Sequence, residues 1–468
     1  MKKEKRQLLL IIFGIGFIFL PSLFGYFSGD DWAVMRTSQI SSLPEFFNFF
    51  LAHTPQSLTF FRPLPQQLFF NLFGALFGLH PFPYYFFVLS CFLLSLYFLY
   101  RLARKIGFDH LQALLTVTVY GTAAANFARI YFLSAFQDVL LPLLVILSLL
   151  TFLDKRYWLF LLYFALALLS KETAVVTPFL LIALTLYLRK KNYTNTIPYL
   201  LVVGLYLFYR LKYFGGAVGD SYLWDFSLKK AANTLLWYVL WALGTPEIMV
   251  DYVGSGLRII PRYYTDFPQW GKVILAELGS LFTIFFAFLI VSYRDLFKKH
   301  RLVFFCLFIF VVSLAPVLFM PWHKFTHALS LPMIGSSLLL GFFLSKPSFL
   351  SKALIAVYLV TNISMMFFLY PRFYAVNRGK ISRLVYTYFA EIYPSPPLNT
   401  SFLFVNDPKG YKGGENQSKE VALAVSQSDF FKVFYHDRSY QVYFVDLPIS
   451  TPSGTVIHVD SGQFLKRY

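Results

Sequence analysis

Long apolar runs, separated by short segments in which Lys and Arg collect, decide what this chain can fold into. Each run holds roughly 15–22 residues, close to the ~20 residues with which a helix crosses the apolar core of a bilayer. Apolar residues make up 57% of the 468 residues and charged residues only 14%, which excludes a soluble enzyme, a disordered chain and a secreted disulfide scaffold. The sequence therefore predicts a multi-pass membrane protein.

The first apolar run follows the Lys-rich residues 1–6, as in a signal peptide, but no small-residue cleavage site comes after it. We therefore interpret it as an uncleaved first span. With ten further runs it predicts an all-α polytopic membrane bundle of about eleven transmembrane helices. The expected spans lie near residues 8–27, 82–101, 111–128, 138–153, 157–170, 174–188, 197–211, 272–293, 302–320, 328–345 and 353–370.

The net charge of +18 is explained by the positive-inside rule, under which Lys and Arg collect in cytoplasmic loops, and does not indicate a nucleic-acid-binding surface. If the first span starts in the cytoplasm, every later basic cluster also falls on the cytoplasmic side. This agreement predicts a cytoplasmic N-terminus and an extracytoplasmic C-terminus in the plasma or inner membrane of a cell, with membrane lipids but no nucleic acid as partners. The clusters lie at residues 1–6, 101–105, 155–156, 189–191, 294–301 and 346–352.

Two segments break the pattern of simple spans. Residues 28–81 form a long external loop whose short apolar helices are interrupted by prolines, so we expect them along the membrane interface. Residues 212–271 form a second external loop. Its apolar stretch 231–244 has a helical pattern, but counting it as a span would invert every later basic cluster. We therefore interpret it as interfacial or re-entrant.

The composition changes at Tyr374, where charged residues, Gly, Ser and Pro become as frequent as in a soluble segment. Residues 1–373 are therefore expected to form the transmembrane domain, and residues 374–468 a small extracytoplasmic α/β module. A helix is predicted at 419–427. Short strands are predicted at 401–406, 430–435, 441–446 and 455–460.

Two adjacent carboxylates, Asp30 and Asp31, follow the first span in the sequence FSGDDW. Because like charges repel, at least one of them is expected to have a raised pKa, and a carboxylate of this kind can act as a general base. The alternative interpretation is a solvated acidic turn that follows Gly29.

Arg62, Lys171 and Glu172 are the next candidates for chemistry. Arg62 stands between aromatic residues and prolines in FFRPLPQQ, where a guanidinium on a rigid segment could clamp a phosphate through two bonds. Lys171, in LLSKETAVVT, could hold a phosphate as a point charge beside Glu172. The alternatives are an interfacial Arg that reaches the lipid headgroups and an ion pair within a helical hairpin.

Further polar residues lie between apolar runs on the same side. Arg129 comes before Asp138, which we interpret as the N-terminal cap of the next span. His323, Lys324 and His327 lie together in PWHKFTHALSLP. The two histidines have the spacing of a metal pair on one helix face, but no third ligand is evident, and a cationic phosphate site is the alternative. We expect no metal site and no cofactor, with a divalent cation as the open alternative.

These candidates share one predicted external face, which also carries Arg372. One carboxylate pair and several cations on that face fit transfer from an anionic lipid-linked donor. The carboxylate would deprotonate an acceptor hydroxyl, and the cations would stabilise the leaving phosphate. Other reactions of phosphate-linked lipids need the same groups, so these residues define only a class of chemistry.

The order of the motifs resembles that of the GT-C membrane glycosyltransferases, and above all the protein O-mannosyltransferases with lumenal TPR repeats and their bacterial relatives. In that pattern an acidic pair in the first external loop precedes an RPL segment, here residues 62–64, and a KE pair follows a later span, here Lys171 and Glu172. The segment HALSLPMIGSSLLLG resembles their RYLYLPSIG segment, with His327 in place of Arg. The resemblance covers roughly residues 1–345, and no TPR repeats follow the spans.

The resemblance implies a GT-C-like bundle and an inverting transfer of a sugar from a polyprenyl-phosphate-linked donor, undecaprenyl phosphate in a bacterium. It implies Asp30 as the base with Asp31 assisting it, and Arg62, Lys171 and Glu172 as active-site groups near the donor phosphate. The acceptor stays open between a protein, a lipid and a cell-envelope glycan. The alternative classes are a transporter or flippase of lipid-linked sugars, which would carry charges at the bilayer midplane, and a structural membrane protein.

The predicted orientation can be measured with topology reporters fused after Lys105, Lys191, Lys299 and Tyr468. The first three fusions should report the cytoplasm, because basic loops are retained there, and the last should report the outside. A cytoplasmic signal from the fusion after Tyr468, or an external signal from the others, would contradict the shared external face.

Overall fold

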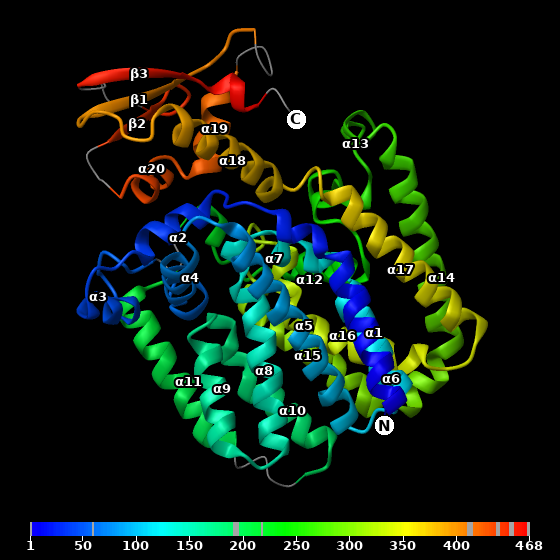
Figure 1. Cartoon of the computed structure of the whole chain (residues 1–468). Helices are drawn as coiled ribbons and strands as arrows, with labels where there is room; N and C mark the ends of the chain where they lie inside the picture. Colours follow the sequence, from blue (N-terminus) through cyan, green and yellow to red (C-terminus); the bar gives the residue numbers. More distant parts are fainter. Residues whose placement is uncertain are drawn as a thin grey trace.

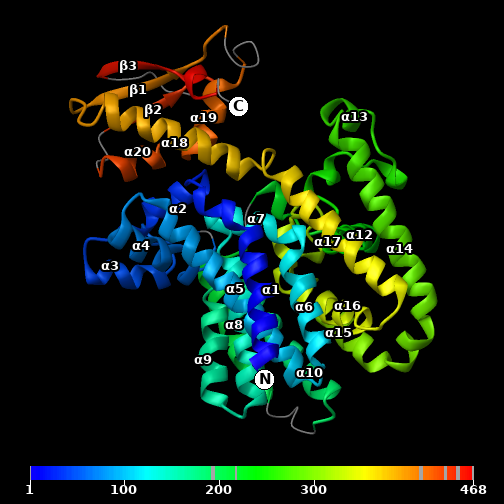
Figure 2. The same cartoon turned by 45° about the vertical axis from the view of Figure 1, so that its right-hand side comes forward.

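The computed structural model describes residues 2–58, 60–190, 196–216, 219–409, 415–436, 440–448 and 454–465. It is a bundle of helices with a small α/β module at one end (Figure 1). The N-terminus lies at the opposite end of the bundle from this module, which Figure 2 shows from a second side. The predicted class, a helical membrane bundle with a C-terminal α/β module, is confirmed.

Every one of the eleven predicted spans contains a helix. Among the described residues, six stretches are long and apolar enough to cross a membrane: Pro81–Lys105, Leu133–Leu153, Ile197–Phe214, Trp270–Lys298, His300–Leu318 and Phe349–Ile392. The helices of the bundle are α1 (Lys2–Ile18), α5 (Pro81–Lys105), α6 (His110–Thr122), α8 (Gln137–Leu153), α9 (Tyr157–Leu168), α10 (Thr177–Tyr187), α11 (Ile197–Tyr209), α14 (Trp270–Lys298), α15 (His300–Leu318), α16 (Pro332–Leu344) and α17 (Phe349–Leu369).

The remaining helices of the bundle are shorter than the predicted spans. The first span was expected at residues 8–27, but α1 ends at Ile18 and a 3₁₀ turn follows at Leu20–Phe24. Pro21 in this turn has no backbone N–H to continue an α-helix. Long apolar runs in the sequence therefore include turns and loop residues as well as helix.

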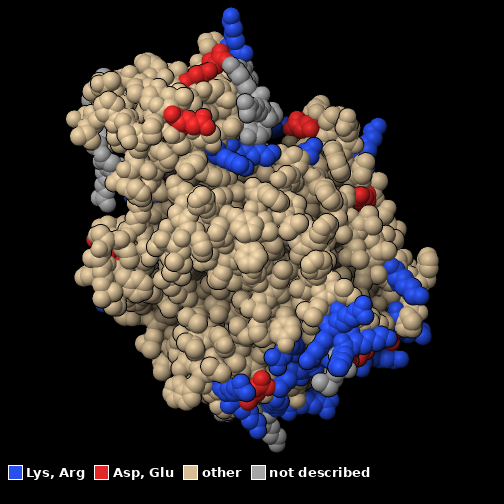
Figure 3. Space-filling model, in the orientation of Figure 1, with Lys and Arg blue, Asp and Glu red and all other residues tan. Residues whose placement is uncertain are grey.

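The surface of the bundle agrees with a membrane setting. Figure 3 shows a broad, mostly uncharged band across the middle of the face in view, with Lys and Arg gathered at the end of the bundle that carries the N-terminus. Large apolar side chains are exposed on this bundle, among them Phe13, Phe286 and Phe367. Side chains of this kind are stable on a surface that faces lipid, and the chain is a multi-pass membrane protein.

Helix α16 packs closely between α6 and α15 because it carries glycines at the two contacts. A Cβ atom on Gly341 would lie 2.6 Å from the backbone N and 2.8 Å from the Cα atom of Thr116 on α6. A Cβ atom on Gly335 would lie 3.0 Å from the backbone N of Phe310 on α15. Small residues at such contacts let the backbones of membrane helices approach each other and gain van der Waals contact.

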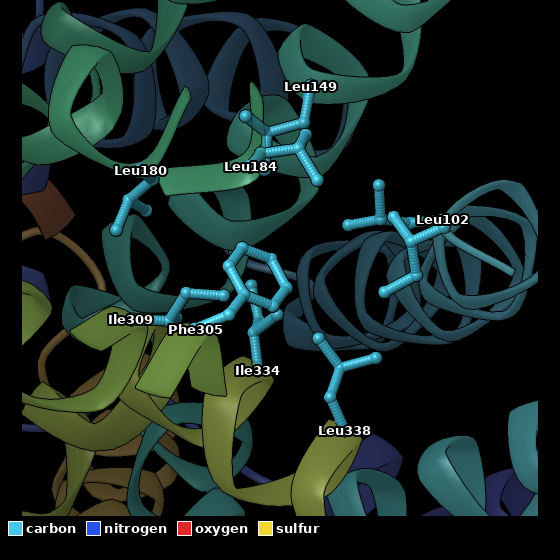
Figure 4. Close-up of a pocket in the computed structure, with 9 residues that line it drawn as sticks. Leu102, Leu149, Leu180, Leu184, Phe305, Ile309, Ile334 and Leu338 are labelled. Atoms are coloured by element: carbon cyan, nitrogen blue, oxygen red, sulfur yellow. The ribbon is translucent and has the colours of Figure 1, made fainter. Parts of the chain in front are cut away.

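The centre of the bundle is tightly packed. A cavity of about 10 Å³ remains where α5, α8, α10, α15 and α16 meet (Figure 4). This volume is about the space that one water molecule needs, and the apolar walls give a water molecule no hydrogen-bond partner. This interior is therefore a core and holds no polar substrate. The cavity is lined by Leu102, Ile106, Leu149, Leu180, Leu184, Phe305, Ile309, Ile334 and Leu338.

The two predicted external loops form short helices at the end of the bundle that carries the module. The first loop folds into α2 (Asp30–Ser38), α3 (Leu43–Phe47), turn η3 (Leu64–Leu68) and α4 (Phe69–Phe77). In the second, α12 (Leu228–Leu243) covers the predicted stretch 231–244, and it buries Trp237 and Trp241. This helix is not among the six candidate spans.

The C-terminal module is a three-stranded parallel sheet with helices packed on it. Helix α18 (Tyr374–Ile392) leads into the sheet, whose strand order is β2-β1-β3. The central strand β1 (Thr400–Val405) pairs with β2 (Gln441–Phe444) and β3 (Thr455–Asp460), which places Phe404 opposite Phe444 and Val459. Helix α19 (Gln417–Val425) confirms the helix predicted at 419–427.

One predicted strand is wrong. Residues 430–435 lie in helix α20 (Asp429–Phe434) instead. The aromatic run FFKVFY favours a strand by composition. In the structure, Phe430 and Phe434 stack one helical turn apart with their ring centroids 5.4 Å from each other, and Phe431 faces the sheet from the same helix.

The close contact at Gly341 can be tested by replacing it with Ala. The added methyl group overlaps the backbone of α6, and overpacking of this kind costs about 1–3 kcal/mol. The melting temperature of the purified variant should therefore fall. Gly204→Ala on α11 is the matched control: no atom lies within 4 Å of its Cβ position. An equal effect of both substitutions would contradict close packing at Gly341.

Candidate active site

Several short segments meet at the N-terminal end of α8, on the side of the bundle that carries the module. Helix α2 packs against turns η3 and η5 (Leu133–Ala135), and turn η12 (Thr326–Ser330) packs against α8. The backbone N–H of Leu64 in η3 donates to the carbonyl oxygen of Leu169, near turn η6 (Glu172–Val176). Most of the predicted site residues lie on these segments, so the fold brings them together from distant parts of the sequence.

Asp31 is an anchor for this region. Its side chain is fully buried, with 0% of its surface exposed. Its Oδ1 atom accepts hydrogen bonds from the backbone N–H (2.8 Å) and the hydroxyl (2.6 Å) of Ser134, and its Oδ2 atom accepts one from the backbone N–H of Ser28 (2.9 Å). Burial raises the pKa of Asp31 to about 7, against the opposing effect of these bonds. No acceptor molecule can reach this carboxylate without displacing protein.

Asp30 differs from its neighbour in exposure and in hydrogen bonding. It is exposed, and within the described ranges its side chain makes no hydrogen bond or ion pair. Surrounding protein atoms nevertheless raise its pKa above the ordinary value for Asp, while Arg378 on α18 lowers it. Successive residues of an α-helix are rotated by ~100° about its axis, so the side chains of Asp30 and Asp31 point in different directions. Asp30 is thus the member of the pair that a ligand can approach.

Arg62 and Glu172 form an ion pair across the site. The Nε atom of Arg62 donates to Oε2 of Glu172 at 2.9 Å, and its Nη2 atom donates to Oε1. Burial opposes the charge on Glu172, but Arg62 and Lys171 lower the pKa of this carboxyl to about 2. In the described part of the chain no hydrogen bond uses the Nη1 atom of Arg62. This amino group can therefore still bind an anion.

Lys171 is paired with Asp138 and is not an open point charge. Its Nζ atom lies 2.5 Å from Oδ1 of Asp138, and only 8% and 1% of the two side chains are exposed. Asp138 lies in the first turn of α8 and does not cap it, so the predicted cap is wrong. The reason is the nearby ammonium group, which is a stronger partner for the carboxylate than a backbone N–H. The buried Oδ2 atom of Asp138 has no hydrogen-bond partner among the described residues.

Arg129 lies inside the protein rather than on its external face. Its side chain is 1% exposed, and its guanidinium carbon lies 5.4 Å from the ring centre of Phe92 and 5.2 Å from that of Tyr120. Its Nη1 atom donates to the carbonyl oxygen of Asp138 at 3.1 Å, and its Nη2 atom donates to the side chain of Asn126. This arrangement supports the start of α8 and does not expose the guanidinium to a ligand.

His323 and His327 lie beside the buried pair but do not share a helix. His323 precedes turn η12, and its ring stacks on that of Tyr222 with 4.2 Å between the centroids. Burial and the nearby Lys171 lower the pKa of each histidine to about 4, so both rings are neutral at pH 7. No group of three His, Cys, Asp or Glu residues able to hold a metal ion occurs in the ranges that the structure describes.

Two other predicted cations lie at the edge of the site. The Nζ atom of Lys324 donates to the side chain of Asn233 on α12 at 3.3 Å. The guanidinium of Arg372 stacks on the ring of Phe368, 4.3 Å from its centroid, and donates to the carbonyl oxygen of the same residue. Neither side chain contacts the acidic pair.

Tyr222 and Glu247 were missed from the sequence. Tyr222 lies within electrostatic range of Arg62, Glu172 and Asp30, and so connects the ion pair to the exposed carboxylate. Glu247 accepts hydrogen bonds from the backbone N–H and the hydroxyl of Thr326, both at 2.6 Å, and burial raises its pKa. Both residues come from the second external loop, where Glu247 follows Pro246 and Tyr222 lies in no pattern that indicates a site.

The first loop and the C-terminal module hold each other. The backbone N–H of Gly29 donates to the carbonyl oxygen of Ala424 at 2.8 Å. The indole Nε1 atom of Trp32 donates to the hydroxyl of Ser382 at 2.8 Å, and its ring packs edge-on against Phe430. An ion pair of 2.5 Å joins Arg36 to Asp429. The position of Asp30 therefore depends on the module as well as on the bundle.

Two solved structures align with most of the chain. Both are of the oligosaccharyltransferase of Archaeoglobus fulgidus, one in complex with Zn and sulfate (14% identity, TM-score 0.45) and one in the apo form (13% identity, TM-score 0.43). They align with 94% and 85% of this chain, which spans 62% of the length of that protein. No curated protein matches the chain.

Part of the sequence also matches a protein-family model. Residues 62–211 match the model described as dolichyl-phosphate-mannose-protein mannosyltransferase. The matched segment starts at Arg62 and includes Lys171 and Glu172, so it contains the ion-pair network at the start of α8. The similarity to this family extends over these 150 of the 468 residues.

Proposed function

We propose that the protein transfers a sugar from a polyprenyl-phosphate-linked donor to an acceptor hydroxyl, with Asp30 as the general base. The observation that carries this proposal is the contrast within the acidic pair: Asp31 is buried and fully hydrogen-bonded, and Asp30 is exposed beside it. A base must be able to reach the proton that it removes, and only Asp30 meets this condition. The family match supports the class of reaction.

The proposed step is an inverting displacement. The acceptor oxygen attacks the anomeric carbon of the donor sugar while Asp30 takes the hydroxyl proton, and the bond between this carbon and the phosphate oxygen breaks. Polyprenyl phosphate leaves with the electron pair of that bond. Arg62 is suited to the leaving phosphate because its Nη1 atom is still available to bond while Glu172 fixes the other side of the guanidinium.

Lys171, His323 and His327 surround the same region. We propose that the Lys171–Asp138 pair fixes the start of α8, and that the Lys171 ammonium is the end of this neutral pair that lies nearer the phosphate. The two neutral imidazoles can donate a hydrogen bond to a phosphate or a sugar hydroxyl. Arg129 and Lys324 were expected to bind the donor. Because both donate hydrogen bonds to other protein groups, we propose that they stabilise the segments around the site instead.

The orientation follows from the basic clusters. We propose that the N-terminus is cytoplasmic and that the site and the module lie outside the plasma or inner membrane, where the acceptor is a protein, a lipid or a glycan. Residues 374–468 would form a domain that holds the first loop from this side. The predicted independence from metal ions can be tested by assaying transfer after treatment with a chelator.

The proposal for the base predicts different effects of two similar substitutions. Asp30→Asn keeps the shape of the side chain but removes its basicity, so transfer should fall ~100- to 10,000-fold while the melting temperature stays unchanged. Asp31→Asn places an amide N–H against the N–H of Ser28 and leaves buried donors unpaired, which costs about 1–3 kcal/mol. This variant should melt earlier and lose activity in part.

Both variants can be assayed with purified protein and a polyprenyl-phosphate sugar. Full transfer by the Asp30→Asn variant would refute the base, and a stable but inactive Asp31→Asn variant would move the base to Asp31. A wild-type protein that moves intact lipid-linked sugar across vesicles and forms no glycosyl product would support the flippase alternative instead.

A second prediction concerns the buried pair. Asp138→Asn leaves the Lys171 ammonium buried without a counterion, which costs about 3–5 kcal/mol. The double variant Lys171→Met/Asp138→Leu should recover most of this stability, yet its KM for the donor should stay raised by about tenfold, because a charge near the phosphate is missing. Asp154→Asn, which breaks the exposed pair with Lys105, is the control and should change stability little. A wild-type KM in the double variant would limit Lys171 to a structural role.

A further inference from the structure

A second cavity lies away from the candidate active site, between α12, α14, α15 and α16. It has a volume of about 150 Å³, and its walls are almost entirely apolar. The outer surface of α14 next to it carries exposed Phe286 and Ile290, so this part of the bundle faces the membrane. Among the side chains that line the cavity are Leu243, Phe288, Leu296, Phe310, Leu339 and Phe343.

Cations surround one end of this cavity. Arg294, Lys298, Lys299 and Arg301 lie at the turn from α14 to α15, and none of them forms a salt bridge within the described residues. Lys346 is nearby but is already paired with Asp295, and its ammonium lies 5.3 Å from the ring centre of Phe343, which lines the cavity. Figure 3 shows Lys and Arg gathered at this end of the bundle.

The positions along α14 connect the two features. Leu296 lines the cavity and lies between Arg294 and Lys298 in the sequence, so the cavity begins at the level of the cations. Lys299 lies 5.8 Å from the ring centre of Phe342, one residue from Phe343. An apolar pocket and a group of unpaired cations therefore adjoin each other at one membrane surface.

We propose that this place binds an anionic phospholipid, with an acyl chain in the cavity and its phosphate among Lys298, Lys299 and Arg301. An empty apolar cavity forfeits the van der Waals contacts of its lining, and a lipid chain supplies them. Clusters of Lys and Arg at a membrane surface attract anionic headgroups, and basic pockets between helices bind them specifically. A zwitterionic lipid would leave the excess positive charge unmatched.

The sugar donor is also a phosphate with an apolar chain, but its phosphate belongs at the other end of the bundle. Helix α15 contains 19 residues, so its start at His300 lies about 28 Å along the helix axis from its end, which leads to His323. A phosphate next to Arg62 cannot lie among the cations of the α14–α15 turn at the same time. The lipid site is therefore separate from the proposed reaction and does not depend on it.

The test measures binding of dioleoyl phosphatidylglycerol and dioleoyl phosphatidylcholine to the delipidated full-length protein in detergent, by native mass spectrometry. The anionic lipid should bind more tightly. The variant Lys298→Gln/Lys299→Gln/Arg301→Gln should bind it about 100-fold more weakly, from roughly fivefold for each of the three cations removed at the surface. Ala242→Leu, which fills part of the cavity without changing charge, should weaken binding of the same lipid severalfold.

The variant Lys2→Gln/Lys3→Gln/Lys5→Gln is the matched control, since it removes the same charge at the same end of the bundle from a helix that does not line the cavity. It should bind phosphatidylglycerol as the wild type does. Equal binding of both lipids, an equal loss in the control, or wild-type binding by the Ala242→Leu variant would overturn the proposal. Displacement of phosphatidylglycerol by polyprenyl phosphate would assign the cavity to the donor chain instead.

Discussion

The hydrogen bonds of the buried Asp31 carboxylate fix the first external loop on the bundle. They join the first external loop to turn η5 at the start of α8, 103 residues further along the chain. Because a buried carboxylate is costly unless hydrogen bonds satisfy it, this contact strongly favours one position of α2. Asp30, next to it on α2, stays exposed.

Charge neutralisation explains how the other polar residues can lie so deep. Lys171 is stabilised by Asp138, and Arg62 by Glu172, so two cations are held in a largely buried site without a net charge for each pair. A pair of this kind fixes geometry more than it adds stability, because the cost of desolvation offsets much of the attraction. The pairs therefore arrange the site at small cost to the fold, and they leave one donor group of Arg62 for an anion.

The sequence predicted the parts of this structure that depend on local composition. Apolar runs located every helix of the bundle, since any helix in a membrane must have an apolar surface. The roles within the site depend on partners far along the chain. Asp30 and Asp31 have identical side chains, and Asp138 lies 33 residues before its partner Lys171, so no local pattern could separate the buried carboxylate from the exposed one, or a helix cap from a counterion. The aromatic residues of α20 led to a wrong prediction of a strand. They are aromatic because they are buried against the module, and burial does not require a strand.

The contacts between α2 and the module also set an order of assembly. The indole of Trp32 donates to Ser382, a residue 350 positions later in the chain. The packing of the first loop can therefore be completed only after almost the whole protein has been synthesised. In a chain truncated within the bundle, the segment of Asp30 would contact the bundle but not the module. Contacts between residues so far apart in the sequence form slowly, because the entropy of closing the long loop is lost before the contacts can stabilise the fold. The region that carries Asp30 is synthesised early, and its packing is completed last.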